Sequence, residues 1–279
     1  NPHRPRRRTK QENNIQRRYM INKNFCMSSY LAFRYIEREG MDFYEGLHHE
    51  NIPLPNPEQL TYVHTAEDID KAIQKVFDSL KGEKLGICLS GGMDSAILAS
   101  YMRGCDAYTF RFLGGEYQKE ELARAEYYAK YYGLNLHYVD IDWHTVEQYL
   151  PIVMRKKNAP VHSIEPQLYQ AAIQAKANGV THMIIGDCSD VLFGGLDQLL
   201  SKDWKFNDFK KRYTFLDPTI VLKNPVDMSY LFEPYKQGEN IDFQRFLLDI
   251  YDIESSSSYY NAFLAADIPY TDPYALLRM

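Results

Sequence analysis

Apolar residues follow two different periods along residues 65–200. Short, mostly apolar runs have the length of buried strands, and longer stretches between them place apolar residues at helical spacing. The predicted strands are residues 85–89, 107–112, 134–141 and 182–186. The predicted helices are residues 65–80, 94–102, 120–132, 146–154 and 166–177, with another that begins at Val191.

This alternation of strands and helices predicts an α/β fold, in which a parallel sheet is sandwiched by helices. Ligands of such sheets bind at the carboxyl ends of the strands. The strand that ends at Leu89 leads into residues 90–94, and the strand that ends at Ile185 leads into residues 186–195. We therefore expect both loops to open on the same edge of the sheet.

Four segments are predicted along the chain, and residues 65–200 form the α/β domain. Residues 1–18 are basic and polar with almost nothing to bury, which predicts a disordered arm or one that docks on a partner. Residues 19–64 combine a helical stretch with a Pro-rich connector. Residues 201–279 show no strand–helix alternation, and we expect a helical part that closes the site, with a loop over the site at 215–238 and an amphipathic helix at 241–253.

Composition excludes several classes of protein. The 279 residues carry a net charge of -5, which argues against nucleic acid as the main partner. No apolar run is long enough for a membrane span and no signal peptide opens the chain, so we expect a cytoplasmic protein with no membrane association. The four cysteines are scattered, and we expect reduced thiols and no metal other than the one inferred below.

The stretch SGGMDS, residues 90–95, has the pattern of an anion-binding loop. It joins a strand to a helix N-terminus, where unpaired N–H groups and the helix dipole favour a phosphate. Gly91 and Gly92 allow positive φ and close approach to the backbone, and Ser90 and Ser95 add hydroxyl donors. Because Asp94 would repel a polyphosphate unless a divalent cation bridged them, we infer Mg²⁺.

This loop lacks the lysine of a Walker A motif, and its pattern is also compatible with a simple capping turn of the helix. However, SGGMDS resembles the SGGxDS signature of the PP-loop ATP pyrophosphatases. Members of that superfamily have an adenine nucleotide alpha hydrolase-like, Rossmann-like fold, cleave ATP between its α and β phosphates, and adenylate a substrate oxygen. The resemblance implies this fold and this chemistry.

A second motif, GDCSDVLFGG at residues 186–195, places Asp187 and Asp190 on one side of a helix start. Capping of that helix by Ser189 or Asp190 is the alternative interpretation. The motif is similar to GEGADELFGG of asparagine synthetases, which lies at a similar interval after SGGxDS. This resemblance implies that Asp94 and Asp190 bind Mg²⁺ and that Asp187 acts as a general base toward an amine.

The same resemblance extends to other parts of the chain. It implies adenine binding at Phe110, and it matches Glu121 and Asp272 to acidic residues of the family. It also likens part of residues 19–64 to the linker that precedes the synthetase half of these enzymes. The residues then expected to bind ATP are Leu89, Ser90, Gly91, Gly92, Asp94, Ser95, Phe110 and Gly186.

Several positions depart from the family pattern. Asp187 replaces a Glu, and Ala265 and Asp267 stand where the family has Glu-x-Arg. Residues 254–263 carry serines where a basic residue is common. We also do not find the family's late lysine before residue 279. These departures suggest that ATP handling is retained while the acceptor site differs from one for aspartate.

The resemblance implies an ATP-dependent amide-forming ligase that adenylates a small carboxylate and transfers ammonia or an amine to it. No glutaminase half is present in these residues, so ammonia would be free or come from a separate glutaminase subunit, and a homo-oligomer is compatible with the many tyrosines. Two alternatives stay open: an adenylating enzyme that acts on a sugar, a nucleoside or tRNA, and a degenerate nucleotide-binding subunit of an amidotransferase complex.

Overall fold

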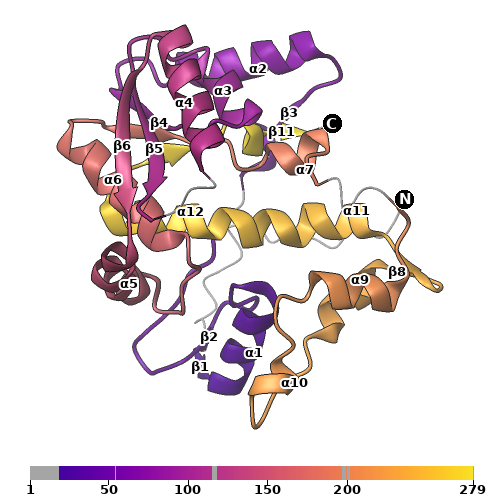
Figure 1. Ribbon diagram of the computed structural model, residues 1–279. Helices are drawn as coiled ribbons and strands as arrows, with labels where there is room; N and C mark the ends of the chain where they lie inside the picture. The colour runs from indigo at the N-terminus through magenta and orange to yellow at the C-terminus, as the bar shows by residue number, and fades with distance from the viewer. Residues whose placement is uncertain (1–18, 54, 115–117, 197–198, 200–201, 279) are drawn as a thin grey trace.

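The computed structural model describes residues 19–53, 55–114, 118–196, 199 and 202–278. Its centre is a five-stranded sheet in the order β10-β7-β4-β5-β6, with every neighbouring pair parallel (Figure 1). The strands are β4 (Leu85–Cys88), β5 (Asp106–Phe112), β6 (Asn135–Ile141), β7 (His182–Ile184) and β10 (Tyr270–Thr271). The predicted parallel α/β sheet is confirmed. The predicted arm at residues 1–18 lies outside the described residues.

Helices cover both faces of the sheet because side chains of successive strand residues point to opposite sides. Ile87, Ala107 and Ile184 pack on one side with helices α2, α3 and α4, and Tyr108 and Met183 pack on the other with α6 and α12. Helix α5 packs on α6 and α12. These helices are α2 (Ala66–Ser79), α3 (Met93–Ala99), α4 (Lys119–Tyr132), α5 (Trp143–Lys157), α6 (Glu165–Ala177) and α12 (Asp252–Ala266).

Local signals account for several helix boundaries. Thr65 and Asp68 form a capping box at the start of α2, in which each side chain accepts a hydrogen bond from the other residue's backbone N–H. Gly133 ends α4 in the left-handed conformation, with φ of 70°. Helix α3 ends at Ala99, three residues before the predicted end, and α5 begins at Trp143, three residues before the predicted start.

The last part of the chain differs from its prediction. Strand β10 follows α12 and pairs in parallel with β7, so strand–helix alternation does continue after residue 201. The predicted helix at 241–253 is the first part of a longer helical run. That run consists of α11 (Phe243–Phe246), the π-helical segment η5 (Leu247–Tyr251) and α12, and it crosses the whole molecule in Figure 1.

A second hydrophobic core lies apart from the sheet and joins residues 25–36 to residues 199–250. Helix α1 (Lys23–Phe33), from the predicted linker, contributes Phe25 and Phe33 to it, and Phe209, Phe232 and Phe246 come from the C-terminal part. From the segment 215–238, Met228, Leu231, Phe232 and Tyr235 pack into this core, and no residue of the segment lines the cavity beside residues 90–95, which corrects the loop predicted there. Its further elements are α9 (Phe206–Tyr213), α10 (Pro218–Val221), η3 (Ser229–Leu231), η4 (Glu233–Tyr235), β8 (Lys236–Gln237) and β9 (Asn240–Ile241).

Short elements complete the described chain. Strands β1 (Met20–Ile21) and β2 (Met41–Asp42) pair in parallel, and so do β3 (Thr61–Tyr62) and β11 (Leu277–Arg278). The remaining elements are η2 (Pro57–Gln59), α7 (Ser189–Phe193) and η6 (Tyr274–Leu276). Among the described residues, no helix combines the length and the apolar character that crossing a membrane requires.

Candidate functional site

The SGGMDS loop connects β4 to α3 at the carboxyl edge of the sheet. Gly92 is the N-cap of α3, and no side chain of the described residues caps this helix end. Ser90 Oγ accepts a hydrogen bond from Gly92 N at 3.2 Å, and Ser95 Oγ lies 3.2 Å from Ser90 Oγ. Since the helix has no side-chain cap, its first-turn N–H groups face the loop, as anion binding requires.

Gly91 is fixed by its backbone conformation and by the neighbouring helix. Its φ is +81°, and a Cβ there would lie 2.4 Å from the backbone oxygen of Glu121 in α4. Arg124 Nε donates to Gly91 O at 3.1 Å, which holds the loop against α4. At Gly92 a Cβ would meet only Ser90 Oγ, at 3.2 Å. Packing therefore requires a glycine at position 91, whereas position 92 has room for a larger residue.

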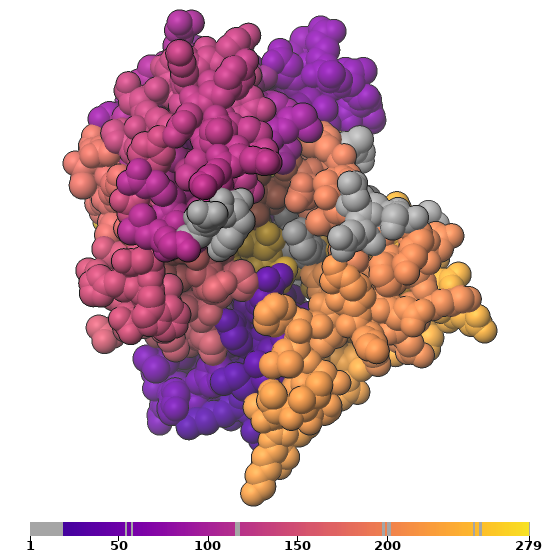
Figure 2. Space-filling model, viewed as in Figure 1, coloured from indigo at the N-terminus to yellow at the C-terminus, as the bar shows by residue number. Residues whose placement is uncertain are grey.

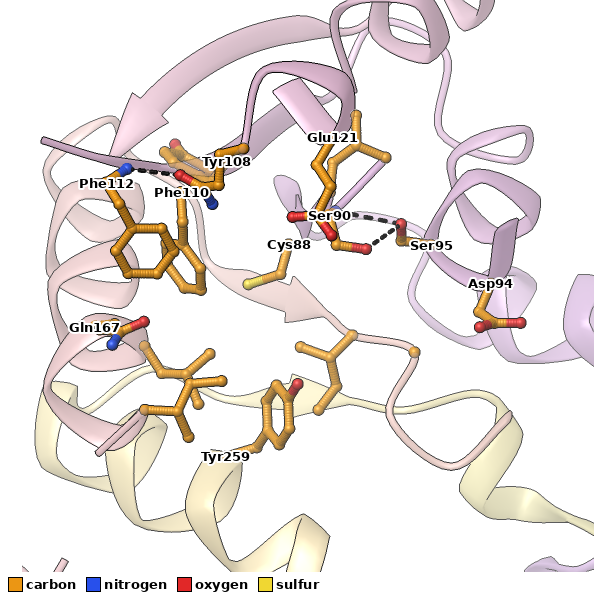
Figure 3. A pocket seen from close by; sticks show the side chains of 16 residues that line it. Cys88, Ser90, Asp94, Ser95, Tyr108, Phe110, Phe112, Glu121, Gln167 and Tyr259 are labelled. Atoms are coloured by element: carbon orange, nitrogen blue, oxygen red, sulfur yellow. Dashed lines mark hydrogen bonds between the residues drawn. The ribbon is translucent and has the colours of Figure 1, made fainter. Parts of the chain in front are cut away.

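The loop borders a cavity of about 290 Å³. Figure 3 shows Ser90, Ser95 and Asp94 on one side of it and the rings of Phe110 and Phe112 on the other. The two rings are tilted, with centroids 6.5 Å apart. Other lining residues come from β4, β5, α4, α6, α12 and the loop after β7: Cys88, Leu89, Tyr108, Gln118, Glu121, Ile164, Gln167, Leu168, Ile185, Gly186 and Tyr259.

The second loop, residues 186–195, is held in place by a buried carboxylate. Asp272 Oδ2 accepts hydrogen bonds from the N–H groups of Asp187 and Cys188, at 3.0 and 2.9 Å, and its Oδ1 accepts from Tyr274 N at 3.0 Å. Burial raises the pKa of Asp272 from 3.8 to about 6. Tyr274 OH in turn donates to the backbone oxygen of Asp94 at 2.9 Å. Asp272 and Tyr274 thus connect the two loops.

The Asp187 carboxylate faces α12. Ser255 Oγ donates to its Oδ1 at 3.0 Å, and Ser256 Oγ lies 3.5 Å from its Oδ2. These serines belong to the stretch where the sequence departs from the asparagine synthetase pattern. The sequence pattern shows only that Ser255 and Ser256 differ from the family. The structure shows that both form hydrogen bonds with Asp187.

Asp190 lies on α7 and its carboxylate fills the space beside Gly195, where an added Cβ would be 1.9 Å from Oδ1. Asp94 lines the cavity, whereas Asp187 and Asp190 are not among its described lining residues. No cluster of three or more His, Cys, Asp or Glu side chains suited to a metal occurs in the part of the chain that the structure describes. Mg²⁺ commonly takes one or two carboxylates together with phosphate oxygens, so Asp94 beside the predicted phosphate-binding loop fits this ion.

The structure brings most of the predicted ATP-binding residues to one cavity: Leu89, Ser90, Asp94, Ser95, Phe110 and Gly186 line it. Gly91 and Gly92 form the loop behind it. Sequence reasoning missed Gln118, whose Oε1 accepts from Phe112 N at 2.9 Å, and Tyr259 of α12. Neither lies in a recognisable motif, and no local signal could have identified them.

Comparisons with known proteins locate the family. The family model described as asparagine synthase matches residues 67–259, which is more than two thirds of the chain. No curated protein matches this chain. Among solved structures, the U34-tRNA thiolase NcsA from Methanococcus maripaludis, with its 4Fe–4S cluster, is 16% identical with a TM-score of 0.34, over 72% of this chain and 78% of that one. A similarity this weak carries no information on substrate or reaction.

Proposed function

Because the chain belongs to the asparagine synthase family, we propose that it is an ATP-dependent ligase that forms an amide. A carboxylate oxygen of the acceptor attacks the α-phosphorus of ATP, which gives an acyl-adenylate and releases pyrophosphate. Ammonia or an amine then attacks the acyl carbon, AMP leaves, and the amine loses a proton. The main support is the cavity that combines the SGGMDS loop, Asp94 and an aromatic wall.

The cavity suits ATP in one orientation. The phosphates would lie on the N–H groups of the loop and on the hydroxyls of Ser90 and Ser95, because these are the donors at the α3 N-terminus. Adenine would lie against Phe110 and Phe112, on the opposite side in Figure 3. Asp94 and Asp190 would hold Mg²⁺, which supplies positive charge for the pyrophosphate as it leaves.

Asp187 is the group proposed to take the proton of the attacking amine. Its carboxylate accepts a hydrogen bond from Ser255 and lies at the edge of hydrogen-bonding distance from Ser256, so its orientation is set by α12. A base needs a fixed position as well as a suitable pKa. We propose that the two serines act as positioning residues for Asp187.

The partners follow from this reaction. We propose a small carboxylate as acceptor, ammonia or an amine as nucleophile, and the cytoplasm as the place of action. A separate glutaminase subunit would supply ammonia. The altered acceptor residues make an acid other than aspartate the expected substrate.

The fate of ATP tests the proposal. Purified protein is incubated with ATP, Mg²⁺, ammonium and a panel of amino acids, hydroxy acids and sugar acids, and AMP with pyrophosphate is measured against ADP with phosphate. AMP and pyrophosphate that appear with one acceptor, together with the amide, would support it. ADP as the product would refute it, and ATP binding without turnover would favour a nucleotide-binding subunit.

The metal role of Asp94 has its own test. Asp94→Asn should lower adenylation by at least about a hundredfold, because the cation would lose a carboxylate ligand at the site of developing charge. Asp203→Asn, which changes an exposed carboxylate that does not line the ATP cavity, is the matched control and should keep full activity. Full activity of Asp94→Asn would remove the metal role.

A further inference from the structure

A second cavity, of about 340 Å³, lies where the second core meets α12. It has the size of a site for a small molecule. Its described lining comes from the C-terminal end of α1, the end of α9 with the residues after it, the segment after α7, and the start of α12. No residue is shared with the lining of the ATP cavity.

Backbone hydrogen bonds build one wall of this second cavity. Phe215 N donates to Ala32 O and Leu216 N donates to Leu31 O, each at 3.0 Å, so the chain after α9 is tied to the end of α1. Arg34 follows α1 in the left-handed conformation, with φ of 62°. That conformation is costly for a residue with a Cβ, and here it directs a guanidinium into the cavity wall.

The charged groups among the described lining residues, Arg34, Arg212 and Glu254, leave an excess positive charge. Arg34 Nε pairs with the buried Glu254 Oε1 at 2.6 Å, and Arg34 Nη1 lies 2.9 Å from His162 Nε2. Burial and the nearby cations lower the pKa of His162 to about 4, so this ring is neutral at pH 7. Arg212 also lines the cavity and is exposed, and its guanidinium makes no ion pair or hydrogen bond with any described residue. Its charge is therefore available to a ligand.

Apolar side chains and polar groups both line the rest of the cavity. Phe33, Leu196 and Leu199 line the cavity, and the Phe215 ring lies 5.1 Å from the Arg34 guanidinium carbon. The Arg212 guanidinium can pair with an anion, and the apolar side chains beside it can contact a hydrocarbon chain. The cavity therefore suits a ligand with an anionic end and an apolar body.

Helix α12 connects this cavity to the proposed reaction centre. Glu254 lines the second cavity, Ser255 bonds to Asp187, and Tyr259 lines the ATP cavity. At 1.5 Å per helical residue, Glu254 and Tyr259 are about 7.5 Å apart along the axis. Figure 2 shows the surface hollowed between the sheet and the second core, with α12 visible at the bottom of the hollow.

We infer that the second cavity holds the far end of the acceptor, and that the acceptor is a carboxylic acid with a second anionic group at the other end of an apolar body. This inference rests on the proposed ligase function for the first carboxylate, which is adenylated beside Asp187. The second anion, a carboxylate or a phosphonate-type group, pairs with Arg212. The apolar body lies against Leu196 and Leu199.

Binding and turnover measured in parallel test this assignment. The ligands are adipate, hexanoate and 6-phosphonohexanoate, each with its homologues of four and eight carbons. Calorimetry measures their binding to the full chain in the presence of ATP and Mg²⁺, and AMP formation is followed in the same samples. The variants are Arg212→Ala, Arg212→Lys and Lys211→Ala. Lys211 is the matched control, because it is an exposed cation on the same helix that does not line the cavity.

We expect a doubly anionic acid to bind at least about tenfold more tightly than its monocarboxylate partner, with the preference lost in Arg212→Ala, partly kept in Arg212→Lys and unchanged in Lys211→Ala. A stronger response to adipate or to the phosphonate identifies the second anion. Equal binding of the paired acids, or a preference that survives in Arg212→Ala, would overturn the inference. Selective binding with no AMP formed would refute the ligase function and leave the anion pocket standing.

Discussion

Gly91 offers the sharpest test of how the SGGMDS loop is built. In Gly91→Ala the new Cβ must adopt a φ of +81° and would lie 2.4 Å from Glu121 O. The left-handed backbone costs about 1 to 2 kcal/mol for a residue with a Cβ. The overlap adds about 1 to 3 kcal/mol, because a backbone oxygen moves only if α4 moves with it.

We therefore expect Gly91→Ala to lower the free energy of unfolding by about 2 to 5 kcal/mol, a large part of the stability of an ordinary domain. Urea unfolding followed by circular dichroism measures this change. Gly104→Ala separates the two causes, since Gly104 has a φ of +82° and no atom within 4 Å of the added Cβ. It should lose only the backbone part.

Gly92→Ala completes the series. Its φ is -78°, and the added Cβ meets only the Ser90 hydroxyl, so the free energy of unfolding should change little. If Gly91→Ala and Gly104→Ala lose the same stability within error, the contact with α4 does not contribute and the steric explanation is wrong. If Gly92→Ala is the least stable of the three, the assignment of roles within the loop is wrong as well.

Two further predictions concern the second loop. Burial raises the pKa of Asp272 from an ordinary value of 3.8 to about 6 in the folded protein. Between these two values the folded state holds a proton that the unfolded state releases. The free energy of unfolding should therefore fall by up to about 3 kcal/mol as the pH rises from 4 to 6. Urea unfolding across this range should show that slope in the wild type and not in Asp272→Asn; parallel profiles would contradict it. Replacing Ser255 and Ser256 together with alanine should lower kcat about tenfold with little change in the KM for ATP, because they contact Asp187 and do not line the ATP cavity. A change confined to the KM for ATP would contradict this role.

The sheet was predictable because its local signals agree with its packing. The runs at 85–89 and 134–141 are apolar enough to mark strands, and the alternation within them matches the two cores on either face. The start of α2 and the end of α4 were predictable from Thr65, Asp68 and Gly133, since capping depends on neighbouring residues alone.

The features that the sequence could not reveal depend on contacts between distant residues. Strand β10 is two residues long, too short to show a period, and exists because it pairs with β7. The run of four serines near the start of α12 has only moderate helix propensity, and its helical form is supported by packing on α5 and α6.

The candidate site also contains residues that could be predicted from the sequence and residues that could not. Residues 90–95 carry a motif, so their place at the sheet edge followed from topology. The bonds of Asp272 to the loop 85 residues earlier follow from tertiary structure, and so does the approach of Gln118 and Tyr259 to the cavity.

The π-helical segment η5 has a consequence for how this fold can change. A π turn holds one residue more than an α turn, and each residue of a helix rotates the next by about 100° around the axis. Because a π turn takes up this extra residue locally, deleting one residue from Leu247–Tyr251 would let α11 and α12 continue as one α-helix, with Ser255, Ser256 and Tyr259 facing as before. The segment thus lets the chain between the two cores be one residue longer without rotating α12 against α11. The length of the chain at this point can therefore change while both cavities keep their walls.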